Sequence, residues 1–575
     1  METERHEQLA RDRRSFALTL LGGLGFLGLT EACTTDAIGG TAETIDKAVS
    51  ALNGTTNIQW VDTMPSLKGL TGAANWVAIL LGYASAGDGG GGLFTWDTSA
   101  STGDDQGTII VPTGSTTGRW KRIYAGPLDI RWFGARTGTG NDTANKAAIQ
   151  AALDVGAAVY IPAGTFRFDS TLQLKPAQGG RGATLRGEGV ASELCLTGST
   201  VGLSNSLNPT AAGFTLSMFR LTTIVANATA IQLTSAWLTT IRDVHINNDG
   251  GTSWQTGIHL QNGASSPPNN AVVRISDSQV SNCAGDGIKI TDDSGAGGIY
   301  IERCHVAANG GWGINIPAQP NLRLSEVHIV RNDIEGNSSG AVYADYLRTS
   351  SIVGNHLEYP VAVIPIRLGI SGFCFGVQIA SNYVTTQSTS CCIDLSGTLG
   401  SGGLEIVGNV FSCPSAAAAV NLGAHTNVRI ANNRMAPGSQ AVSLYALSSY
   451  SPQALQVQDH ATNWVSGLTH RVRLATSSGP IDDSDSVILV PTSATGVVTL
   501  TLPTQSWAAG YGAVPLTVGR QFTIKSFSNY NVVVTTGGTS FGNIDGAVNW
   551  SLSYLGSVTL CYVQSISGVM LWAVI

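Results

Sequence analysis

Ile329-Val330-Arg331-Asn332 is the most informative stretch of this sequence, because its pattern of an apolar residue with Asn three positions later recurs along the chain. The later copies are Ile352-Val353-Gly354-Asn355, Ile379-Ala380-Ser381-Asn382, Ile406-Val407-Gly408-Asn409 and Ile430-Ala431-Asn432-Asn433. Their starting residues are 23 to 27 positions apart, and a repeat of that length is typical of a solenoid. An Asn at the same corner of every coil can hydrogen-bond the backbone of the coils above and below it, and Asn also tolerates the left-handed turn conformation.

Apolar residues extend this register toward the N-terminus. The expected coil starts are Leu216, Ile241, Ile275, Ile301, Ile329, Ile352, Ile379, Ile406 and Ile430. Val280, Val306 and Ile334 recur five residues after their own starts. In these earlier coils the Asn corner is expected to hold Val244, Ser278 and Cys304.

A second strand is expected in each coil, with the pattern seen at Gly287-Ile288-Lys289-Ile290. Because strand side chains alternate between two faces, the residue between the two apolar ones points outward. Stacked coils then place these outward residues in one file: Gln232, His259, Lys289, Asn315, Tyr343, Arg367, Asp394, Asn421 and Ser443.

Composition agrees with an extended β-protein rather than one compact core. Of 575 residues 70 are Gly, and only 12% are charged. The net charge of −7 and the lack of a long basic run argue against nucleic acid as a partner. The nine cysteines include no paired C-x-x-C motifs at zinc spacing, so we expect small buried apolar residues, with one or two disulfides after export as the alternative.

Residues 1–33 are typical of a twin-arginine signal segment. Arg13-Arg14 precedes an apolar run from Leu18 to Leu29, which is too short and Gly-rich for a membrane span. We therefore expect export to the periplasm or the extracellular space. Lipid attachment at Cys33 is the less favoured alternative.

The rest of the chain divides by composition and pattern. The expected parts are a linker at 34–56, a small β module at 57–126, a β-helix at 127–455 and a β-sandwich at 480–575. Alternating frames such as Gly496–Pro503 predict the sandwich.

The segment 129–166 resembles the opening of the pectate lyase superfamily. It runs Asp129-Ile-Arg-Trp-Phe-Gly-Ala135, then Asp142, a helical stretch at 144–155, and Val159-Tyr-Ile-Pro-Ala-Gly-Thr-Phe166. The resemblance covers about residues 128–450 and implies an all-β, single-stranded right-handed parallel β-helix, closed at its N-terminal end by a short helix that Asp142 or Thr143 caps.

The flanking parts resemble modules of phage tail proteins. Gly87–Asp97 and Gly118-Arg-Trp-Lys-Arg122 are similar to the small module that precedes the solenoid in tailspike-type depolymerases. The C-terminal part is similar to the small β-domain of tail fibres and spikes. That likeness implies a homotrimer or sugar binding as open expectations.

The outward file is where we expect chemistry, since the resemblance implies a polysaccharide substrate lying along one sheet. His259, Lys289 and Tyr343 are able to move or stabilise protons, and Arg367 offers a fixed cation for a carboxylate. The expected substrate-binding residues are Asp286, Trp312, Asn315, Asp345, Arg348 and Asp394. Asp292 and Asp293 are expected to form a turn, with a Ca²⁺ site as the alternative.

Two enzymatic mechanisms and one binding function stay open. A lyase that cleaves a uronate-containing glycan by β-elimination would use Lys289 or His259 as base, Tyr343 as acid and Arg367 to neutralise the carboxylate. A glycoside hydrolase would pair Asp286 with Asp292 or Asp345. A surface protein that binds polysaccharide without cleaving it needs neither set. We favour the lyase, with its active site in the irregular coils before Asn332.

Overall fold

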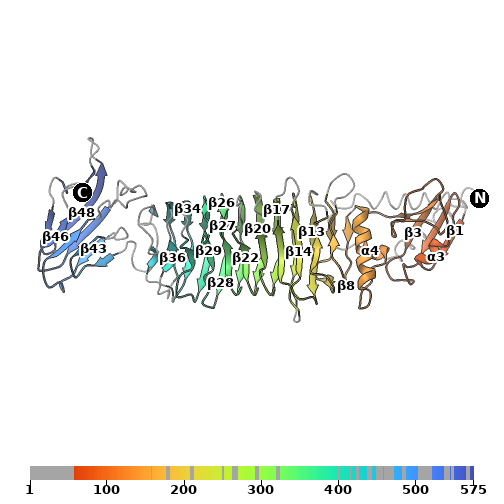
Figure 1. Cartoon of the computed structure of the whole chain (residues 1–575), viewed down its shortest axis with the longest axis horizontal. Helices are drawn as coiled ribbons and strands as arrows, with labels where there is room; N and C mark the ends of the chain where they lie inside the picture. The colour runs from red at the N-terminus through yellow and green to blue at the C-terminus, as the bar shows by residue number, and fades with distance from the viewer. Residues whose placement is uncertain are drawn as a thin grey trace, which may run out of the picture. The chain divides into compact units, whose positions relative to one another are not determined.

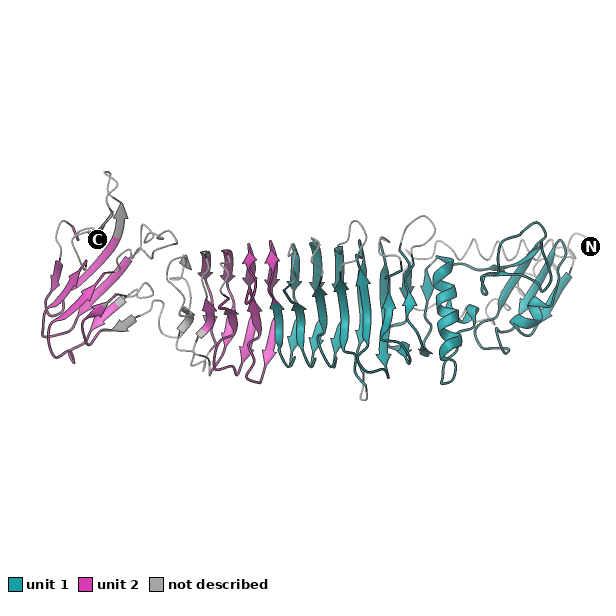
Figure 2. Ribbon diagram, in the orientation of Figure 1, with its two compact units in different colours: residues 1–343 teal, residues 344–575 magenta. Residues whose placement is uncertain are grey.

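The computed structural model describes the chain in two compact units, residues 1–343 and 344–575 (Figure 2). The described residues are 57–156, 158–175, 182–207, 213–248, 252–261, 270–291, 297–318, 324–397, 402–414, 416, 418–422, 426–436, 443–447, 457–458, 472–481, 487–502, 521–536, 544–545, 549–564 and 570–575. The expected signal segment at 1–33, the linker at 34–56, and Asp292 and Asp293 lie outside them.

The first unit begins with a small mixed β-sheet of strand order β1-β2-β3-β5-β4. Its elements are β1 (Asn57–Val61), α3 (Met64–Lys68), β2 (Trp76–Leu80), β3 (Gly92–Asp97), β4 (Ile109–Ile110) and β5 (Arg119–Ile123). Phe94 and Trp120 are fully buried in its core. This module therefore has an apolar core of its own.

The helix α4 (Asp142–Val155) lies across the first coil of the solenoid (Figure 1). Its neighbours are β6 (Leu128–Asp129), η2 (Ile130–Phe133), β7 (Val159–Tyr160), β8 (Gly164–Phe168) and β9 (Leu172–Gln173). It buries the predicted stripe of Ala148, Ile149, Ala152 and Leu153. The predicted cap was wrong: Asn141 is the N-cap, without a side-chain hydrogen bond, and the Asp142 carboxylate instead pairs with Arg167 at 3.3 Å.

The coils of the first unit place two short strands in one long parallel sheet and a third strand in a second sheet. Their elements are β10 (Thr184–Arg186), η3 (Gly189–Ala191), β11 (Ser192–Leu196), β12 (Val201–Ser204), β13 (Thr215–Thr223), β14 (Thr229–Thr234), β15 (Thr240–Ile246), β16 (Thr256–Gln261), β17 (Ala271–Ser276), β18 (Gln279–Ser281), β19 (Ile288–Thr291), β20 (Gly297–Glu302), β21 (His305–Ala307), β22 (Trp312–Ile316), β23 (Val327–Val330), β24 (Asp333–Glu335) and β25 (Gly340–Ala344). The predicted coil starts from Leu216 to Ile329 pair in one column, which confirms that register.

The second unit continues the same pattern in its own coils. Its strands are β26 (Leu347–Arg348), β27 (Ser351–Val353), β28 (His356–Tyr359), β29 (Ile366–Leu368), β30 (Cys374–Phe375), β31 (Gln378–Ala380), β32 (Tyr383–Thr386), β33 (Ile393–Leu395), β34 (Gly402–Val407), β35 (Val410–Ser412), β36 (Ala418–Leu422), β37 (Thr426–Ala431), β38 (Arg434–Met435), β39 (Ser443–Leu447) and β40 (Val457–Gln458). The column from Ile352 to Ile430 is confirmed.

One predicted register in the second unit is wrong. Asn421 pairs with Ala446 and not with Ser443, so the last coil is displaced by three residues. Leu444 and Leu447 lie three positions apart, and either fits the end of the apolar pattern. The alternation alone therefore could not choose between the two registers.

The Asn ladder is present, and its side chains are buried. The Asn382 Oδ1 accepts hydrogen bonds from the main-chain N–H and Nδ2 of Asn355 at 2.9 and 3.0 Å, while its Nδ2 donates to Ile352 O at 2.9 Å. Asn409 and Asn433 repeat these bonds one coil later each. Each ladder Asn thus satisfies backbone groups that burial would otherwise leave unpaired.

At these corners the left-handed conformation belongs to the residue before the ladder Asn, for example Arg331 with a φ of 56° and Ser381 with a φ of 55°. The preceding residue makes the turn, and the Asn is left free to direct its amide along the stack. The earlier corner residues are confirmed in place, since Val244 N donates to Ser278 Oγ and Cys304 N donates to Asn332 Oδ1.

Glycine is the first residue of the second-strand pattern because a side chain at that position would clash with neighbouring atoms. A Cβ at Gly287 would lie 2.8 Å from Asn309 Nδ2 and 2.9 Å from Val306 Cγ1, and one at Gly257 would lie 2.3 Å from Val280 Cγ1. Atoms of side chains do not approach a real Cβ so closely. These glycines therefore let the second strand pass close to Val280 and Val306, which lie on β18 and β21 of the following coils.

The C-terminal residues form a β-sandwich of two sheets, ordered β41-β43-β45-β48-β49 and β42-β44-β46-β47. The strands are β41 (Val472–Leu474), β42 (Gly479–Pro480), β43 (Val487–Val490), β44 (Val498–Thr501), β45 (Gln521–Ser526), β46 (Val532–Thr535), β47 (Asn549–Leu552), β48 (Ser557–Gln564) and β49 (Met570–Val574). Both sheets contribute to a core that includes Phe522, Val534 and Trp572. The predicted fold class, an all-β parallel β-helix with a capping helix and a C-terminal sandwich, is confirmed.

Eight of the nine cysteines are described; all eight are buried, and none of these eight forms a disulfide. Burial raises the pKa of Cys283, Cys304, Cys374 and Cys391 to about 12. They are thus small core residues, as expected. Among the described helices, none has the length and apolar character needed to cross a membrane.

Candidate functional site

The predicted file exists in the first unit as the outer face of β14, β16, β19 and β22. Gln232 pairs with His259, His259 with Lys289, and Lys289 with Asn315. All four side chains are half-buried, whereas the flanking Ile and Leu residues are buried. We call this set, together with Asp286, Thr291, Trp312 and Tyr343, the His259 face.

His259 is the residue of this face whose protonation is most strongly affected. Its Nε2 lies 2.7 Å from Thr291 Oγ1, which belongs to the next coil. Burial, with a smaller contribution from the Lys289 ammonium, lowers the pKa of His259 to about 4, and the Asp286 carboxylate opposes this shift. The imidazole is therefore neutral near pH 7 and has a lone pair for a proton or a hydrogen bond.

Asp286 organises the neighbouring coil. Its Oδ1 accepts a hydrogen bond from Trp312 N at 2.9 Å, and its Oδ2 accepts one from Asn315 Nδ2 at 2.7 Å. Asn315 Oδ1 is buried and accepts no hydrogen bond within the described part of the chain. Because an unpaired buried acceptor is costly, this oxygen is suited to receive a hydroxyl of a bound molecule.

Trp312 and Tyr343 form an aromatic pair beside Asn315. Their ring centroids are 5.3 Å apart and the ring planes are tilted by 39°. Both side chains are half-buried. An aromatic pair with partly open rings is suited to stacking against sugar faces.

The predicted residues of the second unit are engaged with one another. Arg367 Nη2 and Nε each lie 3.2 Å from Asp394 Oδ2, and Asp394 Oδ1 accepts hydrogen bonds from Asn421 Nδ2 at 3.2 Å and Ser396 N at 3.1 Å. The guanidinium charge of Arg367 is thus matched by a buried carboxylate within its own unit.

Two further predicted residues lie in the second unit. Asp345 is 2% exposed and accepts a hydrogen bond from Ser371 N at 2.8 Å, so its carboxylate supports a turn. Arg348 is exposed, and its guanidinium lies over the Phe373 ring at 5.4 Å. Asp292 and Asp293 lie outside the described residues.

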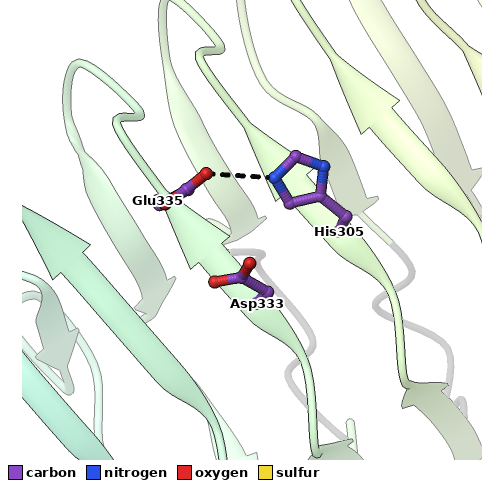
Figure 3. Close-up of side chains that lie close together, drawn as sticks. All are labelled: His305, Asp333 and Glu335. Atoms are coloured by element: carbon purple, nitrogen blue, oxygen red, sulfur yellow. Dashed lines mark hydrogen bonds and ion pairs between the residues drawn. The ribbon is translucent and has the colours of Figure 1, made fainter.

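Sequence reasoning missed a second polar cluster, on the other sheet of the first unit. His305 on β21 and Asp333 and Glu335 on β24 converge there (Figure 3). The signal was present, because these residues flank Val306 and Ile334, whose inward column was predicted. Applying the same alternation to those strands would have placed all three outward.

Comparisons with known proteins support the fold. Residues 129–331 match the family described as rhamnogalacturonase A/epimerase, pectate lyase-like, and residues 61–125 match the phage tail protein small four-stranded β-sheet domain. A search of curated proteins found no match.

Three solved structures that are similar to this chain have low sequence identity to it. The tailspike gp49 of Acinetobacter baumannii bacteriophage Fri1, a capsular polysaccharide depolymerase, is 11% identical with a TM-score of 0.50 over 69% of this chain and 77% of that chain. The gp42 tailspike of Acinetobacter phage vb_AbaP_AS12 is 13% identical with a TM-score of 0.49 over 90% and 94%. The AlgE4 A-module, a mannuronan C-5 epimerase of Azotobacter vinelandii, is 16% identical with a TM-score of 0.42 over 60% and 97%.

The confirmed register, the helix across the first coil and the two family matches lead to one identification. The chain carries a pectate lyase-like parallel β-helix, preceded by a β-sheet domain of the phage tail type.

Proposed function

We propose that this protein cleaves a uronate-containing polysaccharide by β-elimination on the His259 face. The observation that carries the proposal is a neutral, partly buried imidazole directly beside an ammonium group in the adjacent coil. A lyase needs these two groups together, a base for the proton next to the carboxylate and a cation for the charge that develops on it.

In the proposed reaction His259 removes the proton on the carbon that bears the carboxylate. The electrons of that C–H bond form a carbon–carbon double bond while the bond to the glycosidic oxygen breaks, and the leaving oxygen takes up a proton. The Lys289 ammonium neutralises the carboxylate as it becomes enolate-like. An incoming uronate also raises the pKa of His259 by its negative charge, which makes the imidazole a stronger base when substrate is bound.

Coil spacing changes the role that we assign to Tyr343. Adjacent coils are about 4.8 Å apart, so three steps separate His259 from Tyr343 by roughly 14 Å. The base and the acid of one elimination must reach the same sugar unit. We therefore assign Tyr343, with Trp312, to binding a neighbouring sugar, and Lys289 or a water beside it to protonating the leaving oxygen.

The fold likeness and the family match support a polysaccharide as the substrate class. The similar tailspike of phage Fri1 is a capsular polysaccharide depolymerase, and the matched family is pectate lyase-like. The hydrolase alternative is less favoured, because a glycosidase needs two carboxyl groups that reach one glycosidic bond. Asp345, one predicted partner of Asp286, is 2% exposed and accepts a hydrogen bond from Ser371 N.

The test is incubation of the full chain with a panel of uronate polymers. A lyase produces unsaturated ends that absorb in the ultraviolet, and we expect His259→Gln and Lys289→Met each to reduce kcat/KM by at least about 100-fold. His245→Gln is the matched control, because His245 is a half-buried histidine on another sheet. New reducing ends without ultraviolet absorbance would indicate a hydrolase, and binding without either product would indicate a polysaccharide-binding protein; each result would overturn the proposal.

A further inference from the structure

His305, Asp333 and Glu335 form a compact group of three ligand-bearing side chains on the first unit. The strands β21 and β24 are parallel neighbours, with His305 opposite Asp333 and Ala307 opposite Glu335. One ligand atom from each residue lies within 4.8 Å of the other two, and His305 Nε2 is 3.2 Å from Glu335 Oε1. Figure 3 shows the imidazole and the Glu335 carboxylate turned toward each other, with Asp333 beside them.

We propose that these three side chains bind a divalent transition metal ion, with Zn²⁺ as the best match. A neutral imidazole and two carboxylates supply one nitrogen and two oxygen ligands with a total charge of −2, which a divalent cation balances. Zn²⁺ accepts this mixture in four-coordinate sites, with water in the remaining position. Ca²⁺ prefers six to eight oxygens and is a poorer match.

The backbone on both sides of the group is held in place. Before β21 and β24, Cys304 N donates to Asn332 Oδ1 at 2.9 Å, and Asn332 Nδ2 donates to Ile301 O at 2.9 Å. After these strands, Asn309 Nδ2 donates to Asn337 Oδ1 at 2.7 Å. Val306 and Ile334 between them are fully buried.

Such pinning fixes the direction in which the outward side chains leave the sheet. The three ligands therefore need only side-chain rotations to close on an ion, because their strands are already in register. The small side chain of Ala307, opposite Glu335, leaves space on the His305 strand for the Glu335 carboxylate to approach the imidazole.

The simpler interpretation of the group is an ion pair. His305 and Glu335 are each about 40% exposed, and pairs of that exposure contribute little to stability. An ion pair uses only one carboxylate, however, whereas Asp333 also lies within reach of both partners. The two interpretations differ in what they predict for added metal.

The experiment is titration of the full chain, stripped with a chelator, with ZnCl₂ in a calorimeter. We expect one site per chain, and at least about tenfold weaker binding in each of His305→Gln, Asp333→Asn and Glu335→Gln. His245→Gln is the matched control, because His245 lies on a nearby strand of the same sheet. This variant should bind Zn²⁺ as tightly as the wild-type chain does. Circular dichroism checks that each variant is folded.

Titration with Co²⁺ in place of Zn²⁺ is a second measurement, because the visible absorption of bound Co²⁺ depends directly on its ligands. All three variants keep the eight buried thiols, so binding to cysteine would persist in them. Zn²⁺ binding that is unchanged in the three variants, or no binding by the unchanged chain, would overturn the proposal. Neither result depends on whether the His259 face is a lyase site, since the titration contains no polysaccharide.

Discussion

The protonation state of His259 depends on how far its side chain is buried. The outward position is only half-buried, yet the neighbouring Lys289 and the surrounding protein both disfavour a positive charge there. A surface histidine would be partly charged near pH 6.5. Burial therefore turns an ordinary outward residue into a neutral imidazole across the neutral range.

The first prediction concerns pH. Because the pKa of His259 in the folded chain is about 4 and the unfolded value is about 6.5, the unfolded chain binds more protons between these values. This group therefore stabilises the fold above pH 6.5 and loses that contribution as pH falls toward 4. If His259 is the base, the acidic limb of kcat/KM for the free enzyme should lie near pH 4. A limb near pH 6.5 would contradict the assignment.

The second prediction separates the two charges beside the imidazole. Lys289→Met should raise the pKa of His259, since the ammonium lowers it, and Asp286→Asn should lower it further. Histidine NMR titration of the folded chain measures both shifts, with the signal assigned by its loss in His259→Gln. No shift of this pKa in either variant would show that burial alone sets the value.

At the scale of the element, Asn355, Asn382, Asn409 and Asn433 form a chain of buried hydrogen bonds along one corner of the coils of the second unit. Its bonds connect coils and not residues of one strand, so each Asn contributes to the stacking of its neighbours. The second ladder, Asn309 with Asn337, does the same at another corner of the first unit. Regular stacking of this kind keeps the outward residues in register.

The third prediction tests the ladder. Asn382→Ala leaves the N–H of Asn355 and the carbonyl of Ile352 without these bonds in a buried corner. We expect a loss of stability on the order of 3 kcal/mol and faster hydrogen exchange at the Asn355 amide. The control Gln378→Ala, at an exposed position of the same coil, should change stability by less than about 0.5 kcal/mol. Equal effects in the two variants would show that the ladder is not stabilising.

The elements were predictable to the extent that their pattern was periodic. The coil columns from Leu216 to Ile329 and from Ile352 to Ile430 follow from an apolar residue recurring at one phase. The predicted pairing of Asn421 with Ser443 was wrong because Leu444 and Leu447 both fit the same apolar position of the pattern. The tolerance of Asn for a left-handed turn did not indicate which corner residue adopts that turn. The residue before the Asn has the positive φ, and the Asn side chain hydrogen-bonds neighbouring coils.

For the whole molecule, we propose export through the twin-arginine route. The support is Arg13-Arg14 followed by the apolar run to Leu29. Replacing both arginines by lysine in the full chain should stop its appearance outside the cytoplasm, measured by fractionation of the producing cells. Unchanged export of that variant would contradict the proposal. Loss of membrane association in the Cys33→Ser variant alone would instead indicate a lipid anchor.

The all-β solenoid, most of its register and the identity of the outward file can be predicted from the amino-acid sequence. Those properties depend on the alternation of side chains within strands and on the repeat of the pattern from coil to coil, and both can be read directly from the order of residues. Which outward residues come into contact, in contrast, can be read only from the three-dimensional structure. The pairing of Arg367 with Asp394, the neutral state of His259 and the convergence of His305, Asp333 and Glu335 depend on side-chain direction and burial across separate coils. Residues about 27 positions apart in the sequence lie on adjacent coils, about 4.8 Å from each other. The charges of their side chains then determine which of them form contacts, and sequence spacing does not predict those contacts.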